Sequence, residues 1–443
     1  MSPRTTLIRR GFVLTMDPAL GDLPTGDVLV RGGRIERVAE QIDEPADEVI
    51  DAAGMFVLPG LVDTHIHLWQ TPLRGLASDL WKGEYFTEVL PHRERYRPED
   101  MYAGGYVGGL ELLSNGTTTA LDFCHAITSP AHVDSALAGL RDAGLRAVFG
   151  YSVKEKPAGV FGSQADRFDD VARRLEGMGG RLSMMVALSD LETVDIGTCV
   201  REVAFARENG LRMTIHSNFE RQITAMNEAG VLGPDVLPVH GNMFSDDEVL
   251  MLREHGMTLS FTPSVEVYGA PCTVLGRALR AGVPVTWGCD IPSLVNADLF
   301  AQLRLVVHVQ GFLDAQRERR HGRSPVRKAG IPSLTPRAAL HAATLGGATA
   351  LGLGDVTGSL TPGKEADIVL LRADRFGASL CDPAAHIAFQ SGAQDVDTVL
   401  VGGEVRKQAG RLVGDHAARV ATLVEQTRRH VLDRVTAGAG ARS

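Results

Sequence analysis

Eight short apolar runs, each followed by a stretch with helical periodicity, restrict the fold of this chain more than any other feature of its sequence. Most of the runs are rich in Val, Ile, Leu, Thr or Phe, which is typical of buried β-strands. Alternation of such strands with helices indicates a parallel sheet, and the number eight predicts a closed (β/α)8 barrel of the TIM type. The runs span residues 61–67, 117–124, 146–153, 182–188, 212–218, 236–242, 258–264 and 285–291.

An open, doubly wound α/β sheet is the alternative arrangement for alternating strands and helices. That fold places a glycine-rich, phosphate-binding turn directly after its first strand. The first run here is followed by HLWQTPLRG, which contains no such turn. The sequence therefore favours the closed barrel.

The two ends of the chain have a different pattern from the middle. Residues 5–57 and 360–413 alternate apolar and polar positions, as in DVLVRGGRIERVAEQI and VDTVLVGGEVRKQAGRL. Alternation around a Gly-Gly turn is typical of β-hairpins, so we expect both pieces to pair into one small β-sandwich domain. The expected boundaries are 1–57 and 358–413 for this domain, 58–357 for the barrel, and 414–443 for a C-terminal helix and tail.

Charge and composition argue against several classes of protein. The formal net charge is −9 and no run of lysine or arginine is present, which argues against nucleic-acid binding. The five cysteines are widely spaced without a CxxC pair, which argues against a disulfide framework. No apolar run reaches the roughly 18 residues of a membrane span, and the first residues do not form a secretion signal. We expect a cytoplasmic protein with no nucleic-acid or membrane partner.

Two histidines lie one residue apart at the end of the first run, in VDTHIHLWQ. Successive side chains of a strand point to opposite faces, so His65 and His67 share one face. The carboxyl ends of barrel strands are where active sites are assembled. Two imidazoles there can bind one divalent metal ion; a pair of hydrogen-bonded core histidines is the alternative.

Three further metal-capable residues end other runs. His216 ends the fifth run, His240 the sixth and Asp290 the eighth. Core packing alone does not explain five such groups at one end of four strands. A buried aspartate is also costly unless a cation or hydrogen-bond donors meet it. We therefore expect a metal site at this end of the barrel.

Four longer segments carry a resemblance to a known family. They are PGLVDTHIHLWQTPLRGLASDL, ELLSNGTTTALDF, TWGCDIPSLVNADLFAQLRL and AALHAATLGGATALGLGDVTGSLTPGKEADIVLL. Together they resemble the amidohydrolase superfamily over nearly the whole chain, and more narrowly its cytosine, adenosylhomocysteine and s-triazine aminohydrolase branch. The resemblance implies a hydrolase that attacks an sp² carbon of a nitrogen heterocycle and releases ammonia.

The same resemblance implies roles for the five residues. His65, His67, His216 and Asp290 would bind one divalent metal, usually zinc or iron, and imidazole and carboxylate ligands also suit manganese. Such an ion lowers the pKa of a bound water to about 7. Asp290 would accept a proton from that water, and His240 would orient it.

A second metal would require a further ligand at the end of the fourth run. Dinuclear relatives have a carboxylated lysine or a glutamate there. The run reads LSMMVALSDL, in which Asp190 is the only nearby candidate. We therefore expect one metal ion per chain.

One departure from the family pattern concerns the catalytic acid. The branch usually has a glutamate three residues after the fifth-run histidine, where HSNFE has Phe219. Glu220 follows, and because four extended residues span about 13 Å, it reaches the site only if the chain turns. Either Glu220 is the acid, or it is a solvated loop charge and Glu266 of TPSVEVYG replaces it. The departure leaves open hydrolysis of an amide, a cyclic amide or a ring–halide bond, and a non-hydrolytic reaction such as decarboxylation.

Residues in the loops after the runs are candidates for contacts with a flat heterocyclic substrate. Aromatic side chains there can stack on such a ring, and an arginine can bind an anionic or carbonyl group. Packing within a lid or a subunit contact is the alternative for each, since the family often forms homodimers or higher homo-oligomers. A metal-binding scaffold without catalysis is a further alternative, which the complete histidine and aspartate set opposes. The candidates are Gln70, Arg74, Trp81, His125 and Glu266.

Overall fold

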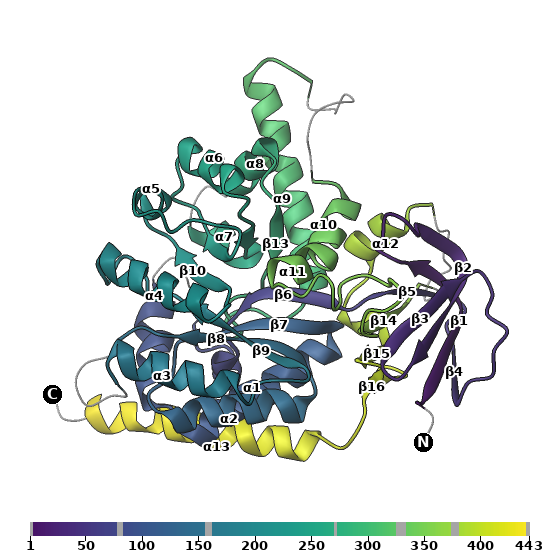
Figure 1. Ribbon diagram of the computed structural model, residues 1–443, viewed down its shortest axis with the longest axis horizontal. Helices are drawn as coiled ribbons and strands as arrows, with labels where there is room; N and C mark the ends of the chain where they lie inside the picture. Colours follow the sequence, from purple (N-terminus) through teal and green to yellow (C-terminus); the bar gives the residue numbers. More distant parts are fainter. Residues whose placement is uncertain are drawn as a thin grey trace.

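A parallel barrel and a separate β-sheet make up most of the molecule, and a long C-terminal helix lies along the barrel (Figure 1). The structure is a computed structural model. It describes residues 3–77, 83–155, 162–269, 273–324, 334–373 and 381–439.

The eight barrel strands lie where the sequence predicts them, and each is hydrogen-bonded in parallel to its neighbour. Sheet order follows the chain from the first strand to the last. A parallel bridge between Ile66 and Asp290 then brings the last strand against the first. The closed barrel is thereby confirmed over the open sheet. The strands are β6 (Leu61–Ile66), β7 (Thr117–Cys124), β8 (Arg146–Ser152), β9 (Leu182–Ala187), β10 (Met213–Ser217), β11 (Val236–His240), β12 (Leu259–Phe261) and β13 (Val285–Trp287).

Helices between the strands begin and end at recognisable capping residues. The side chains of Ser163, Asp195 and Ser245 accept hydrogen bonds from backbone N–H groups of the first helical turn. Gly144 ends α2 with a left-handed φ of 81°, a conformation that favours glycine. The helices are α1 (Pro98–Ser114), α2 (Pro130–Ala143), α3 (Gln164–Leu175), α4 (Ile196–Glu208), α5 (Gln222–Glu228), α6 (Asp246–Glu254), α7 (Pro263–Gly269), α8 (Thr273–Ala281), α9 (Leu299–Arg320), α10 (Pro336–Ala342) and α11 (Leu345–Ala350).

The amino-terminal end of the barrel is closed by an apolar layer. Side chains from five strands pack there against α11. Because this end is filled, the carboxyl ends of the strands form the open end, where short turns η1 (Leu68–Leu73), η3 (Tyr85–Val89) and η4 (Leu90–Arg95) follow β6. The layer contains Val62, Leu121, Val148, Met185, Leu237, Ala348, Ala350 and Leu351.

Both ends of the chain contribute to one nine-stranded sheet, which confirms that they form a common β domain. Its order is β17-β16-β15-β14-β5-β1-β2-β3, and β4 also pairs with β1. The antiparallel pairing of β5 with β14 joins the two ends. The strands are β1 (Thr5–Leu14), β2 (Asp22–Arg31), β3 (Arg34–Ala39), β4 (Glu48–Asp51), β5 (Met55–Pro59), β14 (Ile368–Arg372), β15 (Val396–Val401), β16 (Glu404–Gln408) and β17 (Arg411–Leu412).

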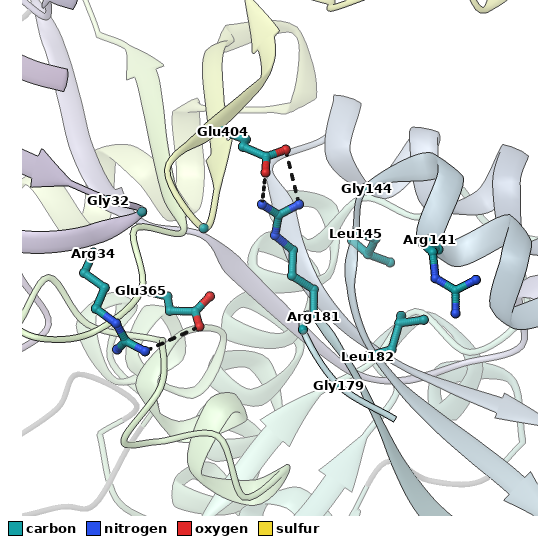
Figure 2. Close-up of a pocket in the computed structure, with 13 residues that line it drawn as sticks. Gly32, Arg34, Arg141, Gly144, Leu145, Gly179, Arg181, Leu182, Glu365 and Glu404 are labelled. Carbon is teal, nitrogen blue, oxygen red and sulfur yellow. Dashed lines mark hydrogen bonds and ion pairs between the residues drawn. The ribbon is translucent and has the colours of Figure 1, made fainter. Parts of the chain in front are cut away.

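Ion pairs cross from the bottom of the barrel to the β domain. The buried Arg146 at the start of β8 donates two hydrogen bonds to the buried Asp367, at 2.6 and 3.0 Å. Beside this pair lies a crevice of about 510 Å³. Figure 2 shows Arg181 paired with Glu404 across it. The two domains are therefore joined by charged groups as well as by chain connections.

The predicted C-terminal helix is α13 (Ala417–Ala439), which packs along α1. Tyr106 of α1 lies in an apolar cluster with Val420, Leu423 and Val424 of α13. A further helix, α12 (Pro383–Gln390), precedes a short turn η5 (Ala393–Asp395) in the β domain region. Within the described residues, no helix has both the length and the apolar character needed to cross a membrane.

Candidate metal centre and active site

The five metal-capable residues predicted at the strand ends lie together at the open end of the barrel. Asp290 Oδ1 is 3.3 Å from Nε2 of both His65 and His67. One ligand atom each from His65, His67 and His216 lie within 4.8 Å of one another, and the same holds for His65, His240 and Asp290. Four of the five side chains are buried and His216 is nearly so, which makes the cluster a potential site for one cation.

A local irregularity in β6 sets the position of His65. Pairing with β7 shifts by one residue between Asp63 and Ile66, because Asp63 lies opposite Ala120 and Ile66 opposite Asp122. The Asp63 carboxylate accepts the backbone N–H groups of His65 (3.0 Å) and Cys289 (3.1 Å). Burial raises the pKa of Asp63 to about 7. Asp63 thus fixes the backbone on both sides of the cluster.

Close approach of the last strand to the first depends on a glycine. A Cβ atom on Gly288 would lie 2.5 Å from the backbone oxygen of His65. Asp290 donates its N–H to that same oxygen at 2.9 Å, and its own carbonyl accepts the N–H of His67 at 2.9 Å. Gly288 therefore permits the contact that places Asp290 against the two histidines.

Two residues of the cluster have a left-handed backbone. The φ angle is 74° at His240 and 65° at Asp290, which is uncommon for residues with a Cβ. Such conformations cost about 1–3 kcal/mol each and persist where surrounding contacts determine them. Strain at the end of β11 and just after β13 marks this part of the barrel as a functional region.

Three of the histidines have an outer hydrogen bond that orients the ring. Nδ1 of His67 lies 2.7 Å from the carbonyl of Phe123, and Nδ1 of His216 lies 3.0 Å from Asp190 Oδ1. Nδ1 of His240 lies 3.0 Å from Glu266 Oε1. Because carbonyls and carboxylates only accept hydrogen bonds, each Nδ1 carries the hydrogen. On His67 and His216, Nε2 is left with a lone pair, which is the arrangement of metal-binding histidines. His240 lies between two carboxylates, and although burial lowers its pKa, Glu266 and Asp290 raise that pKa to about 9.

The remaining groups also fit a divalent cation. His65 is fully buried, and neither ring nitrogen has a hydrogen-bond partner among the residues that the structure describes. Burial holds the pKa of His65 well below its usual value, so the ring is neutral. Burial opposes ionisation of Asp290, but the side chains of His65 and His67, each 3.3 Å from its Oδ1, hold the pKa of its carboxyl well below the usual range. Three imidazoles and one carboxylate are a donor set that suits zinc.

Asp190 lies on the outer side of His216. Its second oxygen is 3.6 Å from Nζ of Lys154. Burial works against ionisation, yet His216 and Lys154 lower the pKa of Asp190 to about 2. The carboxylate therefore accepts a hydrogen bond from Nδ1 of His216 and leaves Nε2 directed at the cluster.

The candidate substrate contacts take different positions. His125 borders the cluster, since its ring centroid is 4.5 Å from that of His67. Gln70 is buried; its amide donates to the Tyr85 hydroxyl at 3.1 Å and accepts from Ser293 at 3.2 Å. Arg74 forms an ion pair with Glu111, and Trp81 lies outside the described residues.

The two candidate acids differ sharply in position. Glu220 is exposed in the turn between β10 and α5, and the side-chain contacts described for the cluster do not include it. Phe219, at the position of the family's glutamate, is 49% exposed. Glu266 is 1% exposed and contacts His240. Of the two acids, the structure brings only Glu266 to the cluster.

The sequence did not reveal the supporting roles of several residues, including Asp190, which it offered only as a candidate ligand of a second metal. Asp63 and Asp190 hold the backbone or ring of a cluster histidine, and Asp122 accepts the N–H of Leu68 at 3.0 Å. Burial raises the pKa of Asp122 to about 6. The available signal was an acidic residue inside an otherwise apolar run, which applies to Asp63 and Asp122 but does not reveal the partner.

Comparison with known proteins identifies a family of hydrolases and several deaminase relatives. A model of the amidohydrolase family matches residues 56–406. A 5'-deoxyadenosine deaminase of Methanosarcina mazei is 30% identical over 429 residues, covering 92% of this chain and 94% of the relative. A 5-methylthioadenosine/S-adenosylhomocysteine deaminase of Desulforudis audaxviator is 31% identical over 455 residues, covering 97% and 99%.

Solved structures share the fold. An adenosine deaminase from Xanthomonas campestris with bound zinc has a TM-score of 0.84 at 22% identity, covering 97% of this chain and 99% of that one. An atrazine chlorohydrolase from Arthrobacter aurescens complexed with zinc has a TM-score of 0.79 at 21% identity, covering 95% and 99%. Both likenesses extend over the barrel and the β domain.

Proposed function

Because the chain belongs to the amidohydrolase family, we propose that it hydrolyses the bond between an amino group and an sp² carbon of a nitrogen heterocycle, releasing ammonia. The observation that carries this proposal is the convergence of three histidine Nε2 atoms and the ionised Asp290 at one end of the barrel. Relatives over nearly the full length are named as deaminases of 5'-deoxyadenosine and of 5-methylthioadenosine and S-adenosylhomocysteine. An adenine nucleoside is therefore the first substrate class to test.

One divalent ion, zinc in the first place, would be held by His65, His67, His216 and Asp290. The neutral ring of His65 with its unpartnered nitrogens and the ionised carboxylate of Asp290 support this assignment. Bound there, the ion would supply Lewis-acid chemistry and lower the pKa of a water molecule to about 7. Iron or manganese would suit the same donors. The engagement of Asp190 with the outer nitrogen of His216 favours one ion over two.

Proton movement is assigned to Asp290 and His240. Asp290 is ionised and can accept the proton of the attacking water. His240 Nε2 lies 3.9 Å from Asp290 Oδ2, so a reacting group beside one contacts the other. His240 would orient the water and stabilise the charge that develops during attack. Glu220 stays a candidate acid only if the turn after β10 brings it inward.

Contacts with the substrate are assigned to the loops above the cluster. His125 is the strongest candidate, because its ring lies against that of His67. Gln70 and Tyr85 form a hydrogen-bonded pair beside the cluster and would present polar atoms to a heterocycle. Arg74 pairs with Glu111 and would bind a substrate group only by exchanging that partner.

A second candidate function is hydrolysis of an amide, a cyclic amide or a ring–halide bond. The exposed Phe219, which replaces the acid that protonates a ring nitrogen, favours it. Halide departs without a proton, so this chemistry places less demand on that acid. A non-hydrolytic reaction such as decarboxylation is a further alternative for the same site.

Product analysis on zinc-loaded protein tests these proposals. The panel would contain adenosine, 5'-deoxyadenosine, methylthioadenosine, adenosylhomocysteine, aminopterins, cytosine and aminotriazines, with matched amides and chlorides. Ammonia release with replacement of an amino by a hydroxyl group is the expected result, and Asp290→Asn should abolish it. Turnover of amides or chlorides alone would replace deamination with the second candidate function.

Assembly and location stay predictions. We propose a homodimer or higher homo-oligomer in the cytoplasm. Light scattering on the full-length protein and fractionation of cells that express it would test the two parts separately.

A further inference from the structure

Glu266 is a buried acid, and both oxygens of its side chain accept hydrogen bonds. It lies in α7, directly after β12, and is 1% exposed. Its Oε1 accepts from the backbone N–H of Thr262 at 3.1 Å and from the Thr262 hydroxyl at 2.9 Å. Its Oε2 accepts from the Asn242 amide at 2.7 Å. These donors fix the positions of both oxygens of the Glu266 side chain.

The same carboxylate faces the outer nitrogen of His240. Oε1 lies 3.0 Å from Nδ1 of His240, while Nε2 of that ring lies 3.9 Å from Asp290 Oδ2. The Thr262 hydroxyl lies between the two carboxylates, 3.5 Å from Asp290 Oδ2. Glu266, His240 and Asp290 therefore form a row of carboxylate, imidazole and carboxylate that ends at the proposed metal centre.

We propose that Glu266 is a positioning residue for the reaction, holding the His240 ring with Nδ1–H on Glu266 Oε1 and with Nε2 directed at Asp290. This inference rests on the proposed hydrolysis. A carboxylate behind a catalytic imidazole fixes its tautomer and orientation. Without it, Nδ1 would face only the Thr262 hydroxyl, which can donate or accept, and either tautomer would fit.

A purely structural role for Glu266 is the competing explanation. Its bond to the N–H of Thr262 also caps the first turn of α7. The two roles are separable, because glutamine keeps an acceptor at the Oε1 position. Asn242 Oδ1 is buried and has no hydrogen-bond partner in the described part of the chain, so rotation of this amide by half a turn would give the new amide of Glu266→Gln an acceptor. Leucine at position 266 keeps the bulk and removes every acceptor.

The test measures the tautomer of His240 and the kinetics of the variants in the full-length chain. Selective ¹⁵N-histidine labelling, with His240→Gln to assign the signal, reports which ring nitrogens carry hydrogen in zinc-loaded protein. We expect the Nδ1–H form in the wild type and in Glu266→Gln, with kcat of the latter within about tenfold. In Glu266→Leu we expect a mixed tautomer and kcat lower by about 10²–10⁴-fold with KM nearly unchanged.

Controls separate positioning from folding. Glu254→Leu removes an exposed carboxylate of α6 and should change neither readout. If Glu266→Leu does not fold, Glu266→Asp replaces it, because a side chain shorter by one methylene cannot reach both Thr262 and His240. The same loss of tautomer preference and of kcat is expected there.

Three outcomes would overturn the inference: an unchanged His240 tautomer in Glu266→Leu, wild-type kcat in that variant, or an equal loss of kcat in Glu266→Gln with the tautomer kept. A loss of kcat in Glu220→Gln but not in Glu266→Leu would instead identify Glu220 as the acid. Absence of wild-type turnover on every substrate would reject the proposed function alone. The tautomer measurement would then decide the inference by itself.

Discussion

Asp290 contacts His65 twice, through its backbone N–H on the carbonyl oxygen at 2.9 Å and through its carboxylate, 3.3 Å from Nε2. The first contact brings the last barrel strand against the first, and the second forms part of the candidate metal centre. The same two residues therefore close the barrel and form part of the candidate metal centre.

Metal removal should consequently destabilise the whole barrel. A ligand present at about 1,000 times its Kd stabilises the folded state by about 4 kcal/mol. We expect a strong chelator to lower Tm by several degrees and zinc to restore it. Asp290→Asn should show little response to either treatment. An equal Tm with and without metal, measured by calorimetry, would contradict the assignment of the ligands.

Asp190→Asn should weaken metal binding without removing a metal ligand. The carboxylate orients His216 through Nδ1, and loss of such an outer partner costs about 10–100-fold in metal affinity. Competition with a chromophoric chelator measures this affinity directly. Asp247→Asn, an exposed change on α6, is the matched control. Equal affinity of both variants would show that Asp190 does not support the centre.

Asp367→Ala should destabilise the junction between the barrel and the β domain. It leaves the guanidinium of Arg146 buried without its main partner, which costs about 3–5 kcal/mol in the free energy of unfolding. Urea unfolding measures the change. Glu425→Gln removes an exposed pair with Arg429, and a change below about 1 kcal/mol is expected there. Similar values for both variants would refute a structural role for the buried pair.

Acid should remove the contribution of the Asp235 carboxylate to the free energy of unfolding. Burial opposes ionisation of Asp235, but hydrogen bonds from Arg207 hold its pKa below 3.8. A carboxyl with a lowered pKa stabilises the fold at pH values above its unfolded pKa, and this stabilisation is lost as the pH falls through the folded pKa. The urea midpoints of wild type and Asp235→Asn should therefore differ more at pH 6 than at pH 3. A pH-independent difference would exclude this linkage.

The barrel strands were predictable because their chemistry is local. Each run is short, apolar and bounded by turn residues, and metal-capable side chains at the run ends identified a common rim. His65, His216 and Asp290 could be placed there without knowing how the loops turn. The pairing of both chain ends was predictable from their shared alternation around Gly-Gly turns.

Contacts made by loops were not predictable in the same way. The shift in pairing between Asp63 and Ile66 depends on a neighbouring strand, and no local pattern reports it. Glu220 lies close to His216 in sequence, yet Arg221 adopts a left-handed φ of 59° and the turn leaves Glu220 exposed. Glu266 is far from His240 in sequence, and only the path of the chain after β12 joins them.

The pairing of β5 with β14 has a consequence for biosynthesis. The chain leaves β5 at Pro59 and enters β6 at Leu61, so the strand that carries His65 continues directly from the β domain. The strand β14, which pairs with β5, is translated only after the whole barrel sequence. One edge of β5 therefore stays unpaired while the ribosome completes the barrel, and exposed edges invite association with other chains. A nascent chain of this kind would depend on chaperones until β14 emerges from the ribosome. A message truncated before β14 would yield a barrel whose first strand continues from an incompletely paired β5.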